Sequence, residues 1–219
     1  MKYIVKKASQ SFKPDGNWNK KQFAGIEAVR LNNFMGAKPA HFPQVEAKLA
    51  YDDNFLYVIF KVDDNYIKAV NTEYDSSVCR DSCVEFFFTP SNDIGHGYFN
   101  AEINCCGTIL LRHQKLSGVE TVVISETDAK KFEIFSTFKG KVEPEITQPR
   151  QWFIEYKIPY EVLKKYAPVM KPAAGVQWRV NFYKCADGTS KPHWLTWNKV
   201  ELPQPDFHRP EFFGTLEFE

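Results

Sequence analysis

The stretch EAKLAYDDNFLYVIFKVDD, residues 46–64, decides the fold. Its two halves are rich in apolar and aromatic residues, and the segment Asp52-Asp53-Asn54 between them is typical of a tight turn. The stretch therefore predicts a hairpin, with one strand ending at Tyr51 and a second running from Phe55 to Val62. The second strand is apolar at nearly every position, which places it at the centre of a sheet with both faces covered.

Similar segments recur along the chain at short and fairly even spacing. They are rich in Val, Ile, Phe, Tyr and Trp and are bounded by turn residues. The expected strands are residues 83–89, 97–104, 108–112, 131–138, 151–158, 176–185, 193–197 and 212–218. Only PYEVLKKYAP, residues 159–168, has helical character, and it predicts one short helix near 159–166 between two prolines. The pattern predicts an all-β fold, an antiparallel β-sandwich of jelly-roll or immunoglobulin-like type.

Length and composition favour a single domain over residues 1–219. With 43% hydrophobic residues the chain can bury a substantial core, and no repeat, low-complexity tract or Gly/Ser linker divides it. The segment EPEITQPRQ, residues 143–151, is interpreted as a surface connection. The 28 basic and 27 acidic residues nearly cancel and form no basic block, which argues against nucleic acid or an anionic membrane as a partner.

Five cysteines and the N-terminus bear on the cellular compartment. The cysteines are Cys79, Cys83, Cys105, Cys106 and Cys185. Their odd number, the adjacent pair and the lack of a C-x-x-C motif argue against a disulfide framework and a zinc ribbon, and favour free thiols. A Cys79 to Cys83 bridge stays open for a secreted protein. No signal peptide or membrane span is visible, so the chain as given is expected to be cytoplasmic, or extracellular or periplasmic if a signal has been removed.

Alternation assigns several polar side chains to one face of the predicted sheet. Side chains two residues apart in a strand share a face, so Val84, Phe86 and Phe88 turn to the core and Glu85 turns away. By the same rule, the neighbouring strands place further polar residues opposite the core, namely Glu102, Asn104, Arg179 and Asn181. If these strands share a sheet, the carboxylates, amides and guanidinium suit a hydroxyl-rich ligand. The alternative is a solvated outer face with cross-strand ion pairs.

The tryptophans divide into core residues and candidates for a ligand platform. Trp152 and Trp178 fall on alternating apolar faces and are predicted to lie in the core. Trp194 and Trp197 fall on opposite faces of one strand beside a proline-rich loop. One of these two can therefore reach a binding site.

The order of the segments resembles that of the carbohydrate-binding modules of family 9. The resemblance covers nearly the whole chain and rests on PDGNWN (14–19), LAYDDNFLYVIFKVDD (49–64), CRDSCVEFFFTP (79–90), YFNAEINCCGTIL (98–110), WFIEYKIPYEVL (152–163), WRVNFYK (178–184) and FHRPEFFGTLEF (207–218). It implies a β-sandwich that binds sugars, in the best-known members the ends of glucan or xylan chains, between two aromatic rings. Such modules are usually attached to glycoside hydrolases.

The resemblance also implies roles for individual residues. The family's binding glutamate and asparagine fall on Glu85 and Asn104. Of its two clamping tryptophans, one aligns with Cys79 and the other with Phe207, and Glu102 stands where the family has arginine. The predicted ligand-binding residues are therefore Glu85, Asn104 and Phe207, with Arg179, Glu102, Asn181 and Trp194 as further candidates.

Three functions follow from these residues. The first is non-catalytic binding of plant-type polysaccharide or oligosaccharide ends. The second is hydrolysis of O-glycosyl bonds with Glu85 and Glu102 as the carboxylate pair, although no spacing fixes their separation. The third is a protein-interaction sandwich without sugar binding, which predicts an exposed apolar patch. The family also implies structural calcium, and the turns Asp52-Asp53 and Asp63-Asp64 offer oxygen ligands for it.

Overall fold

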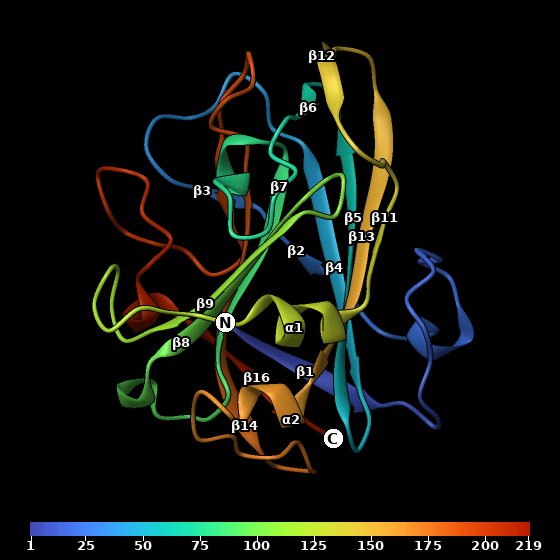
Figure 1. Ribbon diagram of the computed structural model, residues 1–219, viewed down its shortest axis with the longest axis vertical. Helices are drawn as coiled ribbons and strands as arrows, with labels where there is room; N and C mark the ends of the chain where they lie inside the picture. The colour runs from blue at the N-terminus through green and yellow to red at the C-terminus, as the bar shows by residue number, and fades with distance from the viewer.

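The computed structural model describes residues 1–219 and shows a mostly β fold (Figure 1). The strands are β1 (Lys2–Lys7), β2 (Val29–Arg30), β3 (Asn33–Phe34), β4 (Gln44–Tyr51), β5 (Phe55–Asp64), β6 (Ile67–Ala69), β7 (Cys83–Thr89), β8 (Tyr98–Asn104), β9 (Ile109–Gln114), β10 (Val122–Val123), β11 (Ile134–Ser136), β12 (Val142–Ile146), β13 (Arg150–Pro159), β14 (Gln177–Cys185), β15 (Trp194–Thr196) and β16 (Gly214–Phe218). The α-helices are α1 (Glu126–Ala129) and α2 (Tyr160–Leu163). Neither helix has the length to cross a membrane.

The predicted β-sandwich is confirmed, and its two layers share strand β1. One layer has the order β10-β9-β8-β7-β14-β16-β1, and the other continues as β1-β4-β5-β13-β11. The first half of β1 pairs with β16 and its second half with β4, both in parallel, whereas every other strand pair is antiparallel. The sheet is therefore mixed rather than wholly antiparallel. In Figure 1, β4, β5 and β13 run along one side of the molecule, and β7, β8 and β9 cross the other.

The hairpin predicted from residues 46–64 is present as β4 and β5. Asp52 forms the turn between the two strands, because its Oδ1 accepts hydrogen bonds from the backbone N–H groups of Asn54 at 2.7 Å and Phe55 at 2.8 Å. Strand β5 lies between β4 and β13, as its apolar sequence predicts. The hairpin thus forms the centre of its layer.

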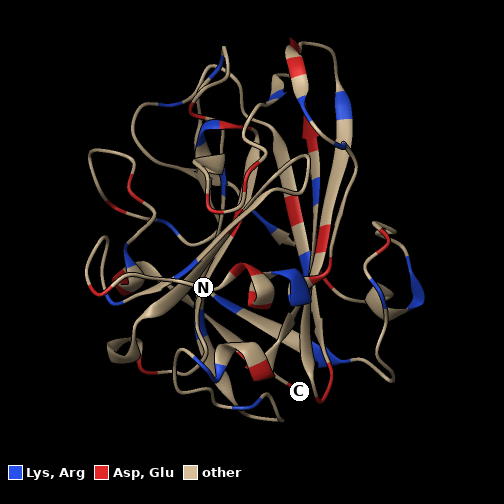
Figure 2. Ribbon diagram, in the orientation of Figure 1, with Lys and Arg blue, Asp and Glu red and all other residues tan.

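A single core of 47 buried residues fills the space between the two layers. It contains the residues that alternation turned inward, including Phe86 and Phe88 on β7. Trp152 and Trp178 have no exposed surface, which confirms that they belong to the core. Charged residues of both signs are spread over the loops and strands around this core (Figure 2).

The expected strand at 131–138 is mostly wrong. Residues 126–132 form α1 and a 3-10 turn, Lys130–Phe132, and only Ile134–Ser136 is extended. The Ser125 hydroxyl caps α1 by accepting the N–H of Asp128, a start signal that the strand assignment overlooked. The predicted helix near 159–166 is present as the single α-helical turn α2.

The segment that contains PDGNWN folds over the outer face of β13. Glu155 on that face is completely buried, and its Oε2 accepts the backbone N–H groups of Asp15 at 2.9 Å and Gly16 at 2.7 Å. Lys20 Nζ lies 2.6 Å from its other oxygen, Oε1. Gly16 has a φ of +74°, which favours glycine, and a Cβ there would lie 2.0 Å from the ring of Phe135.

Candidate functional site

The face of β7, β8 and β14 that lies away from the main core is covered, not solvated. Phe87, Tyr98 and Tyr183 turn to this face and pack with Phe207 and Phe213 of the C-terminal loop in a second apolar cluster. The alternative of a wet outer face with ion pairs is therefore wrong here. Each of the three strands places one aromatic ring on this face, and residues 200–213 cover these rings.

A cavity of about 190 Å³ remains under this covering loop. Glu85 lies in the middle of β7, directly opposite Glu102 on β8 and Tyr183 on β14. Strand β15 and the loop at 205–208 complete the wall. The cavity is lined by Cys79, Glu85, Glu102, Cys185, Asp187, Trp194, Pro205, Asp206, Phe207 and His208.

The two glutamates of the cavity are buried, and the protein forms a hydrogen bond with only one oxygen of each carboxyl group. Glu85 is 2% exposed and Glu102 is 5% exposed. Cys185 Sγ donates to Oε1 of Glu85 at 2.9 Å, and Asn100 Nδ2 donates to Oε1 of Glu102 at 2.9 Å. The Oε2 atom of each glutamate has no hydrogen-bond partner in the protein. Neither oxygen is among the fully buried polar atoms left without a partner, and both glutamates line the cavity, so these oxygens are available to a ligand that forms hydrogen bonds there.

Burial makes both carboxyl groups weaker acids than an exposed glutamate. It raises the pKa of Glu85 well above its usual value, and the adjacent Glu102 charge raises it further. Burial also raises the pKa of Glu102 to about 7, although the hydrogen bond from Asn100 opposes the rise. Neighbouring carboxylates resist double ionisation. The pair therefore offers one hydrogen-bond donor and one acceptor near neutral pH. An alcohol group can accept from the first and donate to the second.

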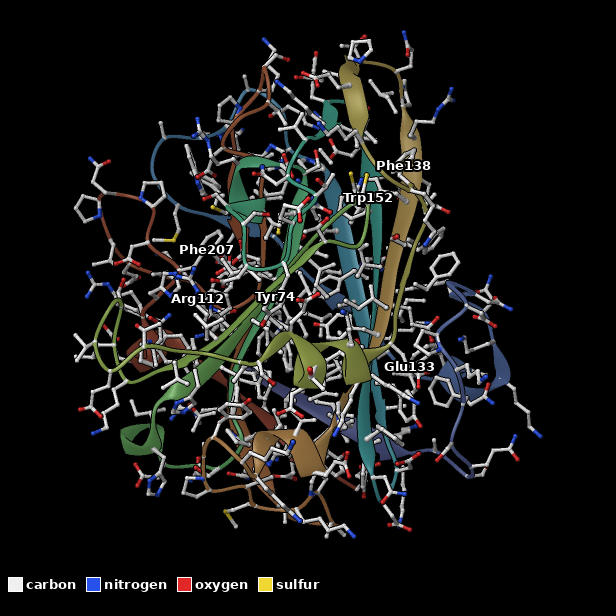
Figure 3. All side chains as sticks on the ribbon, in the orientation of Figure 1. Tyr74, Arg112, Glu133, Phe138, Trp152 and Phe207 are labelled. Atoms are coloured by element: carbon white, nitrogen blue, oxygen red, sulfur yellow. The ribbon has the colours of Figure 1, made fainter.

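Two aromatic rings form the apolar part of the wall. Phe207 is 8% exposed, and its ring stacks on Tyr183 with centroids 4.2 Å apart. Trp194 is half-buried on β15, where it pairs with Cys185, while Trp197 packs into the main core. Of these two tryptophans, Trp194 is thus the one at the cavity. Phe207 lies on the opposite side of the molecule from the core residue Trp152 (Figure 3).

Asn104 is on the same sheet face as Glu85 but does not line the cavity. Its Oδ1 accepts the N–H groups of Cys106 at 3.1 Å and Thr108 at 3.0 Å. Its Nδ2 donates to the carbonyl of Asn71 at 2.9 Å and to Asp81 at 2.8 Å. All its hydrogen-bonding positions are therefore used, two in the turn that follows β8 and two to hold the segment at Asn71 and Asp81, so the structure gives Asn104 a different task from the predicted one.

Arg179 and Asn181 also lie away from the cavity and hold the covering loop in place. Arg179 donates to the carbonyl groups of Phe213 and Gly214. The amide of Asn181 donates to the Asn198 carbonyl at 3.0 Å and accepts the Asn198 N–H at 2.9 Å. These contacts fix both ends of the segment that carries Phe207.

Two acidic residues at the cavity were missed from the sequence. Asp187 follows β14, and Asp206 lies in the covering loop, where it pairs with Arg209 at 2.8 Å. His208 stands beside Asp206, and its Nδ1 lies 2.9 Å from the Tyr98 hydroxyl. Loop residues have no period that assigns them to a face, so the only available signal for Asp206 was its place next to Phe207 in the segment DFHRP, and Asp187 had none.

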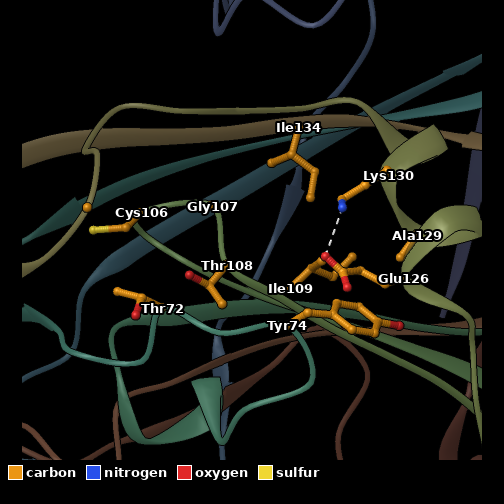
Figure 4. Close-up of a pocket in the computed structure, with 11 residues that line it drawn as sticks. Thr72, Tyr74, Cys106, Gly107, Thr108, Ile109, Glu126, Ala129, Lys130 and Ile134 are labelled. Atoms are coloured by element: carbon orange, nitrogen blue, oxygen red, sulfur yellow. Dashed lines mark ion pairs between the residues drawn. The ribbon is translucent and has the colours of Figure 1, made fainter.

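A larger cavity of about 400 Å³ lies between β9, α1 and β11 (Figure 4). Tyr74, Ile109 and Ile134 form part of its wall, and Glu126 pairs with Lys130 at 2.9 Å across it. Both charged residues are exposed and neutralise each other, so no buried acceptor is left for a ligand. None of the predicted site residues lines this cavity, and the Glu85 cavity is the stronger candidate.

The acidic turns do not fit the calcium that the resemblance implied. Asp53 pairs with Lys7 at 2.8 Å. Asp64 is completely buried between His41 at 2.7 Å and Lys184 at 3.6 Å. Lysine ammonium groups lie where a cation would bind, whereas calcium requires six to eight oxygen ligands.

Comparison with known proteins places this chain in a family. A sequence model described as carbohydrate-binding family 9 matches residues 17–218. The chain belongs to carbohydrate-binding family 9. No curated protein matches this family 9 chain.

Solved structures share the fold of this family 9 chain. A protein of Bacteroides uniformis ATCC 8492, provisionally described as carbohydrate-binding, has a TM-score of 0.88 and 29% identity, over 100% of this chain and 99% of that one. A family 9 module of Caldicellulosiruptor kristjanssonii in complex with glucose has a TM-score of 0.65 and 16% identity, over 100% and 96%. The same module in complex with cellotriose has a TM-score of 0.64 and 16% identity, over 100% and 94%.

Proposed function

We propose that this family 9 module binds one sugar unit at the end of a glucan-type oligosaccharide or polysaccharide, in the Glu85 cavity and without cleaving it. The observation that carries the proposal is the pair of buried carboxyl groups, Glu85 and Glu102, which each keep an unpartnered oxygen at a cavity with aromatic walls. Sugar hydroxyl groups donate and accept hydrogen bonds, and the apolar face of a sugar ring packs on an aromatic side chain.

The size of the cavity favours the end of a chain. Its volume of about 190 Å³ equals that of roughly six water molecules in the liquid. Such a space admits one pyranose ring and excludes a run of several. The cavity is also closed on one side by the covering loop, so a polymer cannot thread through it.

The placement of the two acids favours binding over hydrolysis. Glu85 and Glu102 lie in register on adjacent strands and face a ligand from the same wall. Glycosidases place their two carboxyl groups on either side of the bond that breaks. This difference supports a module that holds a sugar for another protein to process.

The solved relatives support a glucan-type ligand. The Caldicellulosiruptor kristjanssonii module was solved with glucose and with cellotriose. We therefore place glucan ends first and xylan ends second among plant-type ligands, and we associate the chain with polysaccharide degradation as part of the proposal.

Replacing Glu85 by alanine tests the proposed site. Titration calorimetry with glucose, cellobiose, cellotriose and xylobiose should show binding by the wild type and at least about 10-fold weaker binding by Glu85→Ala. A hydrogen bond that involves an ionisable group contributes about 1.5–3 kcal/mol. The matched control is Glu126→Ala at the other cavity, which should bind like the wild type. Equal loss in both variants, or release of shorter sugars during incubation, contradicts the proposal.

A protein-interaction role is favoured by one observation. Four of the eight exposed large hydrophobic side chains, Leu116, Val119, Val122 and Val123, lie within one segment after β9. Exposed apolar side chains grouped in one segment are what an interaction role would use. If the wild type binds none of the sugars tested, the interaction role replaces the sugar-binding role.

A further inference from the structure

Two thiols lie beside Glu85, one of them, Cys185, in the wall of its cavity and the other, Cys83, just behind that wall. Cys83 on β7 and Cys185 on β14 are direct partners in the strand register, and Glu85 follows Cys83 by two residues on the same face. Both cysteines are free and buried. The sulfur atoms of Cys83 and Cys185 and a carboxyl oxygen of Glu85 all lie within 4.8 Å of one another.

We propose that Cys83, Cys185 and Glu85 form a binding site for a thiophilic divalent cation of the Zn²⁺ type. Two thiolates and one carboxylate are a ligand set suited to such a cation. The fourth coordination position of the cation faces the cavity and is left for water or another ligand. This proposal goes beyond sugar binding and does not depend on it.

The separations of the three ligand atoms are close to what the metal requires. Tetrahedral Zn²⁺ has sulfur ligands at about 2.3 Å and oxygen ligands at about 2.0–2.2 Å, which places neighbouring ligand atoms about 3.5–3.8 Å apart. Cys185 Sγ and Glu85 Oε1 are 2.9 Å apart, joined by a hydrogen bond that the metal would replace. The paired strands hold the three Cα atoms in place. Rotation of the side chains can lengthen the Cys185–Glu85 contact and shorten the other two distances to those that the metal requires.

The surroundings favour a cation. Glu102, Asp187 and Asp206 line the same cavity, and no lysine or arginine does. Binding releases the two thiol protons, and the carboxyl proton where Glu85 carries one, and the metal charge then compensates the negative ligands. Cys79 also lines the cavity, although its sulfur is not within the 4.8 Å group.

Cobalt spectroscopy of the reduced protein tests this site in the absence of sugar. Wild type titrated with Co²⁺ should develop a sulfur-to-cobalt charge-transfer band that saturates at one equivalent, and added Zn²⁺ should remove it. The double variant Cys83→Ser/Cys185→Ser should lose the band, and the Cys106→Ser control, which alters a thiol outside the site, should keep it. A wild type without the band, or a double variant that retains it, overturns the proposal.

A measurement on the wild type alone covers the case in which the double variant does not fold. X-ray absorption of the Zn²⁺ complex should show two sulfur ligands at about 2.3 Å together with oxygen ligands. A shell of oxygen and nitrogen only overturns the proposal. Since neither experiment contains sugar, failure here leaves the carbohydrate proposal intact, and loss of sugar binding leaves the metal site intact.

Discussion

Lys184 is a cation with no exposed surface, and its environment explains how the fold tolerates it. It lies on β14 with its side chain turned away from the Glu85 cavity, since Cys185 next to it lines that cavity. Its Nζ donates to the Cys185 carbonyl at 2.9 Å, contacts His193 Nε2 at 2.8 Å and lies 3.6 Å from Asp64. Burial alone would raise the pKa of Asp64, but the Lys184 charge, the hydrogen bond from His41 and the two nearby imidazoles together outweigh it and hold that pKa well below its usual value.

The variant Lys184→Met should be strongly destabilised. It leaves the Asp64 carboxylate buried without its ammonium partner, and breaking a buried pair in this way costs about 3–5 kcal/mol. Urea denaturation followed by circular dichroism measures the loss. The double variant Lys184→Met/Asp64→Asn should recover part of it, because no uncompensated charge remains. A loss below about 1 kcal/mol in the single variant would show that Asp64 does not depend on Lys184.

Among the structural elements, the long strands β4, β5, β7, β8, β13 and β14 could be predicted from the sequence. The N-terminal strand β1 was not predicted, and β12 lies mostly in the segment 143–151 that was interpreted as a surface connection. Period-two alternation correctly placed Phe86 in the core, and together with the family resemblance it directed attention to Glu85. The roles of loop residues depend on which strand each loop covers, which explains why Asp206 was missed. Asn104 shows a different limit, because its sequence position does not reveal that the following turn uses all its hydrogen bonds.

The loop over β13 provides a test of element packing. Gly16→Ala should destabilise the protein through both its left-handed backbone, which costs about 1–2 kcal/mol for other residues, and the overlap with Phe135. Gly140→Ala is the matched control, because Gly140 has a similar φ of +69° and nothing within 4 Å of a Cβ. Thermal unfolding should therefore rank the wild type first, Gly140→Ala second and Gly16→Ala last. Equal loss in the two variants would mean that the loop moves away at no cost.

For the whole molecule, the titration of buried histidine predicts sensitivity to acid. Burial and, to a smaller extent, the Lys184 charge lower the pKa of His193 to about 3, against the attraction of Asp64. His41 also faces this imidazole, with ring centroids 5.7 Å apart. The unfolded chain binds a proton at His193 below a pH of about 6.5, whereas the folded chain stays neutral until about 3.

The titration of His193 should therefore lower the free energy of unfolding as the pH decreases from about 6.5 towards 3. The raised pKa values of Glu85 and Glu102 act in the opposite direction above a pH of about 4.5, because the folded chain binds those protons first, so the difference between the wild type and His193→Gln isolates the histidine contribution. Each proton bound only by the unfolded state contributes about 1.4 kcal/mol per pH unit. Burial also lowers the pKa values of His113 and His208, which adds to the slope in the same direction. Denaturation curves at a series of pH values measure the slope, and His193→Gln should reduce it. A variant with the slope of the wild type would show that His193 titrates normally in the fold.

Strand β1 joins the two layers from one end of the chain, and its partner β16 comes from the other. The Val5 carbonyl accepts the N–H of Glu219 at 3.0 Å, across almost the full length of the sequence. During synthesis, β1 leaves the ribosome well before β16, and the seam between them can form only once both are available. Until then the nascent sandwich keeps unpaired edges on both layers.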